Sequence, residues 1–403
     1  MKILVVSNNC LSFDNNNGKV MRNYLYAFSN DELCNFYISN EKSPVGISSF
    51  NVTNNDALKR FVTFGLFKAK KSSASSENVN GSNIKYSPFK HYLRYLVWNS
   101  GFWKSRKYKN FIKNEKPERI VTFLGNNPYL LKLSYELSKK LSVPLILFIG
   151  EDYPLKNFDY ITRKNKMGFW FRRFHKTEKR CFLKASKMAD LVIFNSDYIK
   201  DAYLEKYAFK KYDIVYHLSS QSHLNNNFDS KVILYAGNMG LGRVDALIDF
   251  ADVLYNVDKT FMLKVFGNAN KIDFDELSKH QNIDYHSFIK NEELIKEYEK
   301  AFALIHVEKN DIYNNTDLEF AFSTKIVDMI CSKKPFLVYA PSCLACSKHL
   351  LKYQEQSIAT NREELEIKLK NLLIQKNNNE NDDLEKLHNI GNCDYIKKII
   401  CEI

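Results

Sequence analysis

Long apolar runs are missing from this sequence. No stretch approaches the roughly 18 uninterrupted apolar residues of a membrane-spanning helix, so we expect none. Residues 1–7 resemble the start of a signal peptide, but they are too few and polar Asn8 and Asn9 follow them, so they read better as a buried strand. The Gly-x-Ser-x-Gly, His-Glu-x-x-His and Walker sequences are also absent, which leaves those hydrolase and phosphate-loop classes without support.

Cysteine is scarce for a chain of this length. The eight cysteines are scattered over 403 residues, and a chain this long needs no disulfide bonds to stabilise it. We therefore expect a reducing, cytoplasmic environment. The length predicts two or three domains, and a hydrophobic content of 45% is sufficient for substantial cores.

Acidic residues are too few to balance the basic ones, which leaves a net charge of +13. Such a charge favours polyanions or an anionic membrane surface. Residues 89–116 and 164–187 interleave aromatic and basic side chains, the pattern of a helix that lies on a membrane. The same pattern also fits stacking on single-stranded nucleic acid, or a core helix with a solvated basic flank. For residues 89–116 alone we favour the core helix, but for the protein as a whole we expect an anionic membrane surface as a partner and no nucleic acid.

The first half alternates predicted strands and helices. Gly18 and Lys19 fall between the first strand and the first helix, where a glycine lets the backbone approach a ligand, although a plain turn explains it equally well. Residues 42–86 lack periodicity and predict a long mobile insertion. A buried strand over 144–149 ends at Glu151 and Asp152, whose carboxylates are candidates for hydroxyl contacts or proton handling.

The alternation restarts after a polar linker. A strand over 231–236 leads into the turn Gly237-Asn-Met-Gly-Leu-Gly-Arg243 and then a helix. The glycines alone are a weak phosphate signal because their spacing is not the dinucleotide fingerprint. Arg243 strengthens the signal, since a guanidinium can bind two oxygens of a diphosphate.

A second candidate element follows a predicted strand over 303–307 that ends at Glu308. Ser323 or Thr324 can cap a helix, and Lys325 in its first turn is unfavourable to the helix dipole unless an anion binds there. A strand end, a carboxylate and a capped helix together predict a ligand crevice in an open parallel sheet. The alternative is an ordinary strand–helix unit with a surface lysine.

Two other clusters are weaker candidates for metal chemistry. Asp273 and Asp275 have a spacing that can bind a metal–diphosphate, but they open a helix, and capping explains them more simply. Cys343, Cys346 and His349 offer three zinc ligands where structural zinc requires four. We predict no metal site.

Residues 231–341 resemble the donor-nucleotide domain of a GT-B glycosyltransferase, and are most similar to the retaining glycosyltransferase family 4. The matching pieces are Tyr235-Ala-Gly-Asn-Met-Gly-Leu-Gly-Arg243, Val265-Phe-Gly267, Asn282-Ile-Asp-Tyr-His286, His306-Val-Glu308, Phe322-Ser-Thr-Lys-Ile326 and Lys334-Pro335. The first half resembles the acceptor domain more loosely. The resemblance implies an α/β fold of two doubly wound domains facing across a cleft.

The resemblance also implies roles for individual residues. Of the family's two basic diphosphate ligands, the second falls on Arg243 and the first on Asn238, so Lys325 is expected to supply the missing charge. The second acid of the family's Glu-x7-Glu motif falls on Asp328 and is expected to contact ribose. The first acid is Glu308 or Glu319, and we favour Glu308 because a strand's carboxyl end points into the crevice.

These implications give a complete set of expected site residues. Those expected to act in catalysis are Arg243, Lys325, Glu308 and Asp152. Those expected to contact the donor are Gly237, Asn238, Gly240, Gly242, Arg243, Phe266, Gly267, Tyr285, Glu319, Ser323, Thr324, Lys325 and Asp328. Those expected on the acceptor side are Gly18, Lys19, Glu151 and Asp152.

The domain boundaries and activity follow from the same resemblance. Residues 1–218 are expected to form the acceptor domain, 219–230 a linker and 231–383 the donor domain, with 384–403 packing back on the first. The implied enzyme is a retaining, metal-independent hexosyltransferase without a cofactor, which uses a UDP- or GDP-linked sugar. Its acceptor would be a lipid-linked saccharide of surface polysaccharide biosynthesis at the inner face of the membrane. A catalytically silent scaffold is the alternative, and a sugar-nucleotide epimerase is a weaker one.

Overall fold

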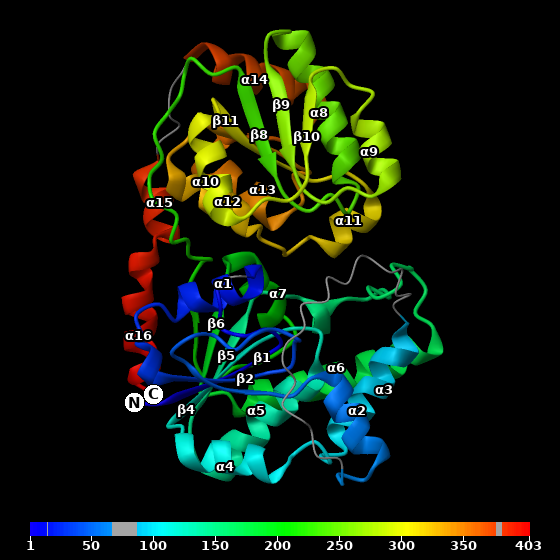
Figure 1. Ribbon diagram of the computed structural model, residues 1–403, viewed down its shortest axis with the longest axis vertical. Coiled ribbons are helices and arrows are strands. Elements are labelled where there is room, and N and C mark those ends of the chain that lie inside the picture. Colours follow the sequence, from blue (N-terminus) through cyan, green and yellow to red (C-terminus); the bar gives the residue numbers. More distant parts are fainter. Residues whose placement is uncertain (14, 67–86, 376–380) are drawn as a thin grey trace. The chain divides into compact units, whose positions relative to one another are not determined.

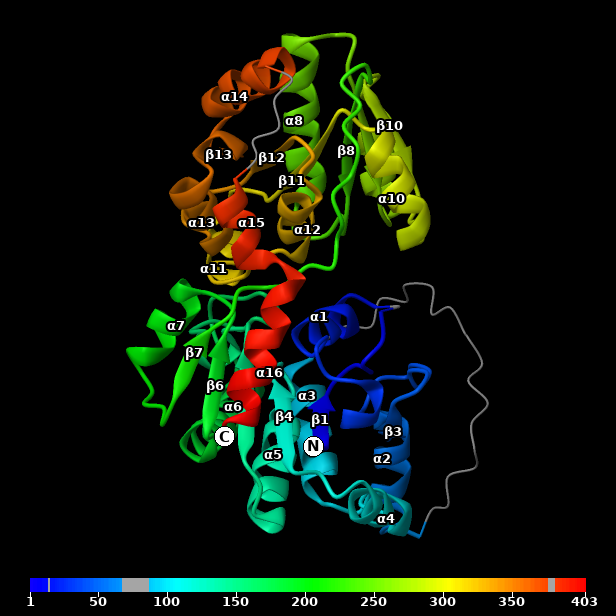
Figure 2. The same ribbon diagram turned by 90° about the vertical axis from the view of Figure 1, so that its left-hand side faces the viewer.

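The computed structural model describes residues 1–13, 15–66, 87–375 and 381–403. These residues form two compact units (Figures 1 and 2). The first unit comprises Met1–Tyr216 and Gly391–Ile403, and the second comprises His217–Ile390. None of the helices in the described ranges is long and apolar enough to cross a membrane.

The first unit is built on a seven-stranded parallel sheet, in the order β3-β2-β1-β4-β5-β6-β7. Its strands are β1 (Ile3–Ser7), β2 (Leu33–Tyr37), β3 (Ser48–Asn51), β4 (Arg119–Phe123), β5 (Leu145–Ile149), β6 (Leu191–Phe194) and β7 (Tyr212–Ile214). Its helices are α1 (Asn16–Tyr24), α2 (Asn54–Val62), α3 (Pro88–Asn99), α4 (Arg106–Glu115), α5 (Pro128–Leu141), α6 (Phe169–Met188), α7 (Asp197–Leu204) and α16 (Cys393–Cys401). Strands β1, β2, β5 and β6 are buried along their whole length, as expected of a sheet covered on both faces.

The second unit is built on a six-stranded parallel sheet, in the order β10-β9-β8-β11-β12-β13. Its strands are β8 (Val232–Ala236), β9 (Met262–Phe266), β10 (Ile283–His286), β11 (Ala303–Val307), β12 (Phe336–Tyr339) and β13 (Ile358–Ala359). Its helices are α8 (Arg243–Val257), α9 (Lys271–Leu277), α10 (Asn291–Lys300), α11 (Ile312–Asp317), α12 (Thr324–Ser332), α13 (Ala345–Tyr353), α14 (Arg362–Gln375) and α15 (Asp382–His388). This is the doubly wound strand order, and its winding reverses between β8 and β11.

Alternate residues of β8 divide the second unit's core into two layers. Ile233 and Tyr235 pack in a cluster with α8, α9 and α14, whereas Leu234 and Ala236 pack with α12, α13 and Leu384. Because strand side chains alternate between faces, one apolar strand serves both layers. The predicted α/β class with two doubly wound parallel sheets is confirmed.

The structure divides the chain at other residues than those expected from the sequence. The chain enters the second unit at His217 and leaves it after Ile390, whereas the predicted linker was 219–230 and the predicted return began at 384. Helix α15 therefore belongs to the second unit, and α16 to the first. In α16, Lys397 forms an ion pair of 2.8 Å with Glu32 and donates to the carbonyl of Ala27.

The prediction of a mobile insertion over 42–86 is wrong for part of that range. Strand β3 pairs in parallel with β2, and Thr53 caps α2 by accepting from the backbone N–H of Asp56. A four-residue strand and a nine-residue helix are too short to show a clear periodicity of apolar residues in the sequence. Residues 67–86 of the predicted insertion lie outside the described residues.

Candidate functional site

The predicted crevice residues of the second unit converge at the point where its sheet reverses direction. Strand β8 ends at Ala236 before Gly237, and the neighbouring strand β11 ends at Val307 before Glu308. Helix α8 begins at Arg243 and α12 begins at Thr324. Because the strands are parallel, their carboxyl ends and the following helix starts lie at one edge of the sheet.

The turn after β8 is a close-packed piece of backbone. A side chain at Gly237 would collide with the Lys325 ammonium and the Tyr235 hydroxyl. The carbonyl of Asn238 accepts from the Tyr235 hydroxyl at 2.9 Å, and its side-chain oxygen accepts from the Gly240 N–H at 2.7 Å. The turn thus brings main-chain groups directly against a lysine.

The end of this turn adopts left-handed backbone. Leu241 and Gly242 have φ angles of 65° and 71°, and Gly242 is the cap residue of α8. Glycine adopts this conformation at little cost, whereas leucine does so rarely. Asn314 stabilises the arrangement by donating to the Leu241 carbonyl at 2.7 Å. Strained backbone of this kind is concentrated at functional sites.

A buried ion pair occupies the centre of the site. Arg243 Nη2 donates to Glu308 Oε1 at 2.7 Å, and His306 Nε2 donates to the same oxygen at 3.0 Å. Burial acts to raise the pKa of Glu308, but His306 and Arg243 outweigh it and lower that pKa. Burial likewise acts to lower the pKa of Arg243, and Glu308 reverses the effect. The pair is therefore ionised.

Several polar atoms in this cluster have no hydrogen-bond partner among the described residues. They are Arg243 Nε, Glu308 Oε2 and His306 Nδ1. Buried polar atoms are nearly always satisfied in folded proteins, because an unsatisfied one costs about 1–3 kcal/mol. Three of them lie on adjacent side chains, which makes this cluster a candidate for binding ligand atoms.

Lys325 completes the cluster from the start of α12. Its ammonium lies 5.7 Å from the centre of the Tyr235 ring. Burial, with a smaller contribution from the Arg243 charge, lowers the pKa of Lys325 to about 8. Ser323 is the cap residue of α12 but makes no side-chain cap hydrogen bond, and the first turn holds no acidic residue. A helix start with a cation and without an acid is suited to bind an anion.

The two acidic candidates for sugar contact lie in different surroundings. Glu308 belongs to the ion cluster, whereas Glu319 is half-buried in the loop before α12, where its carbonyl accepts from the Ala345 N–H at 2.8 Å. Asp328 lies farther along α12 and accepts a hydrogen bond from the Ser219 hydroxyl. Residues 219 and 328 are distant in sequence, and no sequence pattern indicates this contact.

The residues predicted at the end of β9 support the turn. The Gly237 N–H donates to the Phe266 carbonyl at 2.9 Å, and a side chain at Gly267 would collide with the Gly237 carbonyl. Tyr285 donates to the Gly267 carbonyl at 2.8 Å and accepts from the Ala269 N–H. These contacts hold the turn after β8 and the turn after β9 side by side.

The four predicted acceptor-side residues lie in the first unit. The Gly18 N–H donates to the Asn15 side chain at 2.6 Å in the first turn of α1, where Lys19 is half-buried. Asp152 is buried and forms an ion pair of 3.1 Å with Lys156. Its neighbour Glu151 is exposed, and the Glu151 carbonyl accepts from Tyr203. The adjacent carboxylates therefore have different environments.

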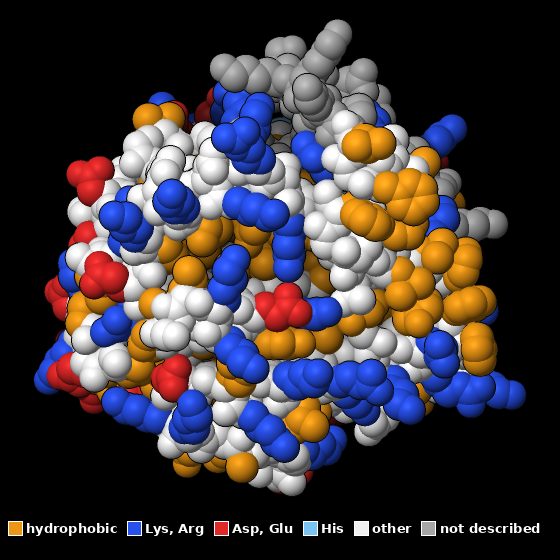
Figure 3. Space-filling view, turned by 90° about the horizontal axis from the view of Figure 1, so that it is seen from below, with side chains coloured by type: hydrophobic (Ala, Val, Ile, Leu, Met, Phe, Trp, Pro, Cys, Tyr) orange, Lys and Arg blue, Asp and Glu red, His pale blue; other side chains and the backbone are white. Residues whose placement is uncertain are grey.

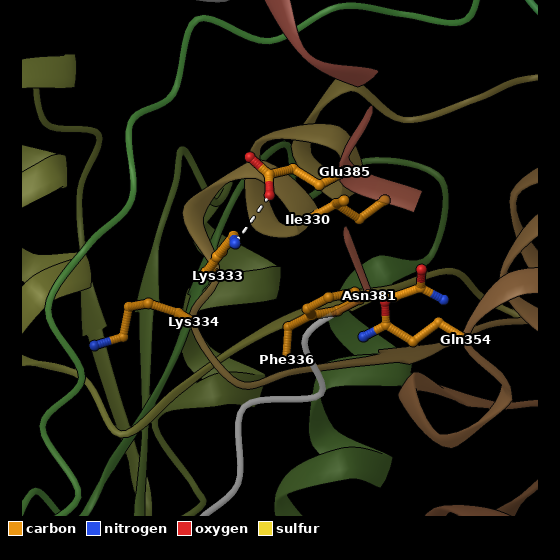
Figure 4. A pocket seen from close by; sticks show the side chains of 7 residues that line it. All are labelled: Ile330, Lys333, Lys334, Phe336, Gln354, Asn381 and Glu385. Atoms are coloured by element: carbon orange, nitrogen blue, oxygen red, sulfur yellow. Dashed lines mark ion pairs between the residues drawn. The ribbon is translucent and has the colours of Figure 1, made fainter. Parts of the chain in front are cut away.

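Two cavities of the second unit are distinct from each other. One, of about 350 Å³, opens beside Glu308, and it is lined by Asp245, Ala246, Asp249, Glu308, Lys309, Asn310, Tyr339, Ala340, Pro341, Thr360, Asn361 and Arg362. The other is only about 10 Å³ and lies at the far end of α12, where Lys333 and Glu385 form an ion pair of 3.2 Å (Figure 4). A ligand pocket requires roughly 300 Å³ or more, so only the first has room for a small molecule.

Two contributors to the cluster were not among the predicted site residues. Tyr235 and His306 lie inside strands, where alternation places them with the core. A histidine two residues before a carboxylate at a strand end was the available signal, because both side chains then point to the same side. No described group of three or more His, Cys, Asp or Glu side chains has an arrangement that could hold a metal ion.

Comparisons with known proteins identify the fold. No protein-family model and no curated protein matches the sequence. Among solved structures, Anabaena Alr3699/HepE in complex with UDP and glucose is similar over 100% of both chains, with a TM-score of 0.61 and 12% identity. The lipopolysaccharide outer core galactosyltransferase WaaB matches 98% of this chain and 100% of its own, with a TM-score of 0.57 and 13% identity. The chain has the GT-B fold predicted from its sequence.

The buried ion pair leads to a prediction for Glu308→Gln. The change leaves the Arg243 guanidinium buried without an anionic partner, so we expect the free energy of unfolding to fall by about 3 kcal/mol. Sulfate or phosphate should restore stability more in this variant than in the wild type, because the freed guanidinium can bind the anion. Urea unfolding with and without each anion measures both effects.

The matched control is Glu319→Gln, which removes a carboxylate outside the cluster. It should change stability little and leave the response to sulfate as in the wild type. If sulfate and phosphate stabilised the wild type and Glu308→Gln equally, loss of the carboxylate would not have made the Arg243 guanidinium available to an anion.

Proposed function

We propose that this protein is a glycosyltransferase that uses a nucleotide-diphosphate sugar. The observation that carries the proposal is the pair of cations, Arg243 and Lys325, at the sheet edge beside an uncapped helix start. A structure with the same fold was solved with UDP-glucose, at a TM-score of 0.58 and 12% identity, which supports a UDP-linked donor. A GDP-linked donor is the alternative.

In the proposed complex, the diphosphate lies between the turn at 237–243 and the start of α12. The bond between the sugar's anomeric carbon and the diphosphate breaks, and its electron pair stays on the phosphate oxygen. Arg243, Lys325 and the N–H groups of α12 stabilise the charge that develops there. Because these groups supply positive charge at the leaving oxygen, we propose a metal-independent reaction.

The acceptor hydroxyl oxygen forms the new bond to the anomeric carbon, with retention, as the resemblance to family 4 implies. Glu308 holds a sugar hydroxyl through Oε2, the oxygen that has no partner in the described structure. Asp152 takes the proton of the acceptor hydroxyl. Phe266, Gly267 and Tyr285 surround the nucleoside, and Asp328 contacts its ribose.

We assign the acceptor to the first unit, through Gly18, Lys19, Glu151 and Asp152. The proposed acceptor is a lipid-linked saccharide of surface polysaccharide synthesis. WaaB, which shares the fold, is described as a lipopolysaccharide galactosyltransferase, and this supports an acceptor of that kind. The protein would then act at the inner face of the membrane.

Replacement of either cation should reduce turnover. We expect Lys325→Ala and Arg243→Ala each to lower kcat by about two to three orders of magnitude, since a lost donor to a developing anion costs roughly 2.7–4 kcal/mol. The measurement is transfer of radiolabelled sugar from UDP- and GDP-sugars in membranes that contain the natural acceptor, with donor hydrolysis in detergent for comparison.

The control for this experiment is Lys271→Ala, an exposed lysine in the first turn of α9. It should retain the wild-type rate. Wild-type rates in both cation variants would show that the diphosphate binds elsewhere. A wild-type protein that binds no UDP- or GDP-sugar would instead support a scaffold function.

The lowered pKa of Lys325 predicts how UDP binding depends on pH. Near pH 8 the lysine loses its proton in the free protein, so UDP affinity should fall from about pH 7 to 9, by up to tenfold per pH unit above the pKa. Binding should raise that pKa and cause proton uptake near pH 8, which calorimetry in buffers of different ionisation enthalpy measures.

Lys334 provides a matched control, because burial also lowers its pKa to about 8. Its ammonium donates to the carbonyls of Asn225 and Glu299, outside the cluster. Lys325→Gln should abolish the pH dependence of UDP binding, and Lys334→Gln should retain it. The reverse result would contradict the role of Lys325.

The contact between Asp328 and Ser219 allows a test of the ribose assignment. Asp328→Ala should weaken UDP binding with a smaller effect on kcat, since a ribose contact changes little as the glycosidic bond breaks. Ser219→Ala removes the hydrogen bond to Asp328 and the one that Ser219 accepts from the Gln221 N–H, and it should bind UDP as the wild type does. Equal loss of UDP affinity in the two variants would indicate that Asp328 acts by holding Ser219.

A further inference from the structure

Helix α3 of the first unit is apolar on both of its sides. Val97 and Trp98 are buried in the unit, whereas Phe89, Leu93 and Leu96 are exposed. Their spacing of four and three residues aligns the exposed side chains on one stripe of the helix. A surface helix normally presents polar residues there, so the second stripe requires an explanation.

The neighbouring elements expose apolar side chains in the same way. At the end of α2, Phe61 and Val62 are exposed, and Leu66 just beyond it is 85% exposed. Helix α6 begins with Phe169 and Trp170, which are 59% and 42% exposed. Each element thus leaves large hydrophobic groups uncovered at its end.

These side chains belong to one continuous surface. Helix α3 packs between α2 and α6, and ring contacts bridge the elements: Phe61 lies 6.2 Å from Phe102, and Phe89 lies 4.6 Å from Trp170, between ring centres. We call this surface the apolar face. It consists of Leu58, Phe61, Val62, Phe64, Leu66, Phe89, Leu93, Leu96, Phe102, Phe169 and Trp170.

Cations border the apolar face, and acids are nearly absent from it. Figure 3 shows hydrophobic side chains gathered beside many Lys and Arg side chains on this side of the molecule. Helix α3 carries no acidic residue, and α2 carries only the capping Asp56. Exposed cations on α2, α3, the first two turns of α6 and the chain just before it include Lys59, Lys90, Arg163, Lys164, Lys166, Arg172, Arg173 and Lys176.

This combination favours a bilayer over a protein partner. Aromatic rings and leucines bury in the boundary between headgroups and acyl chains, while lysine and arginine contact anionic headgroups. Scattered exposed hydrophobic residues are normal, but a continuous set rimmed by one sign of charge marks an interaction site. The face differs from the predicted stretches, because α2 contributes to it, whereas Tyr108 of α4 packs against Phe36 of the sheet.

We propose that the apolar face inserts into the surface of an anionic lipid bilayer. The proposal rests on the proposed function only in so far as a lipid-linked acceptor requires the enzyme at a membrane. Phe169, Trp170 and the α3 stripe enter the headgroup region, and the bordering cations bind the anionic lipids. The protein is thereby held reversibly at the membrane without crossing it.

Trp170 provides a direct probe. The chain has three tryptophans, of which Trp98 and Trp103 are each 3% exposed and Trp170 is 42% exposed. Adding vesicles of phosphatidylglycerol and phosphatidylcholine to the full-length protein should shift the Trp emission to shorter wavelength, and lipids brominated near the headgroup should quench it. Trp170→Phe should remove both signals but still float with the vesicles.

Vesicle flotation tests the face itself. The combined variant Val62→Ser, Leu66→Ser and Phe169→Ser should bind at least about tenfold more weakly, because three buried apolar groups are lost. The matched control is Ile272→Ser with Ile367→Ser, which removes exposed apolar groups from the second unit and should bind as the wild type does. All five sites are exposed, so folding should be unaffected.

Charge is tested separately. Lys90→Gln should weaken binding to the anionic vesicles about fivefold, and Lys271→Gln in the second unit should not. Binding should decline as salt is raised and be weak on pure phosphatidylcholine. UDP binding is measured on every variant, because loss of vesicle binding with intact UDP binding assigns the defect to the face alone.

Three outcomes would overturn the inference. The face variants could float like the wild type, the emission of Trp170 could be unchanged by vesicles, or the wild type could bind neutral and anionic vesicles equally. Concentration-dependent self-association that the face variants abolish would assign the surface to a second copy instead. A wild-type protein that binds vesicles but not UDP would contradict the proposed function. It would still support insertion of the apolar face into a bilayer.

Discussion

The buried ion pair between Arg243 and Glu308 determines the electrostatics of the second unit's sheet edge. It neutralises one of two buried cations, and His306 contributes a hydrogen bond, because burial lowers its pKa and keeps the ring neutral. The remaining charge belongs to Lys325, so the cluster is left with about one net positive charge in a low-dielectric environment. A lysine in that position loses its proton readily, and a bound anion removes the cost of keeping it charged.

The fold explains why these residues meet although they are far apart in the chain. In a parallel sheet the carboxyl ends of all strands lie at the same edge. The reversal of winding between β8 and β11 leaves room there for the turns that follow these two strands. Gly237 and Gly267 allow the backbones of two such turns to touch, which a side chain at either position would prevent. The sheet therefore places two helix starts and a carboxylate beside one turn.

Sequence reasoning predicted those members of the candidate site that follow directly from strand ends. Arg243, Glu308 and Lys325 were predictable because a strand followed by a polar turn and a helix start is visible in the order of residues. Tyr235 and His306 were not, because a residue inside an apolar strand reads as core. The contact of Ser219 with Asp328 and the opposite burial of Glu151 and Asp152 depend on tertiary packing, which has no periodic signature.

The first unit is discontinuous in the chain, and this has a consequence for how the protein is made. Helix α16, whose Ile396 and Ile400 are buried in that unit, follows the second unit in the chain and so leaves the ribosome after it. The whole of the second unit, a single uninterrupted segment, emerges before it. During synthesis the second unit can complete its core early, whereas the first unit gains the apolar contacts of Ile396 and Ile400 only after the second unit has been made.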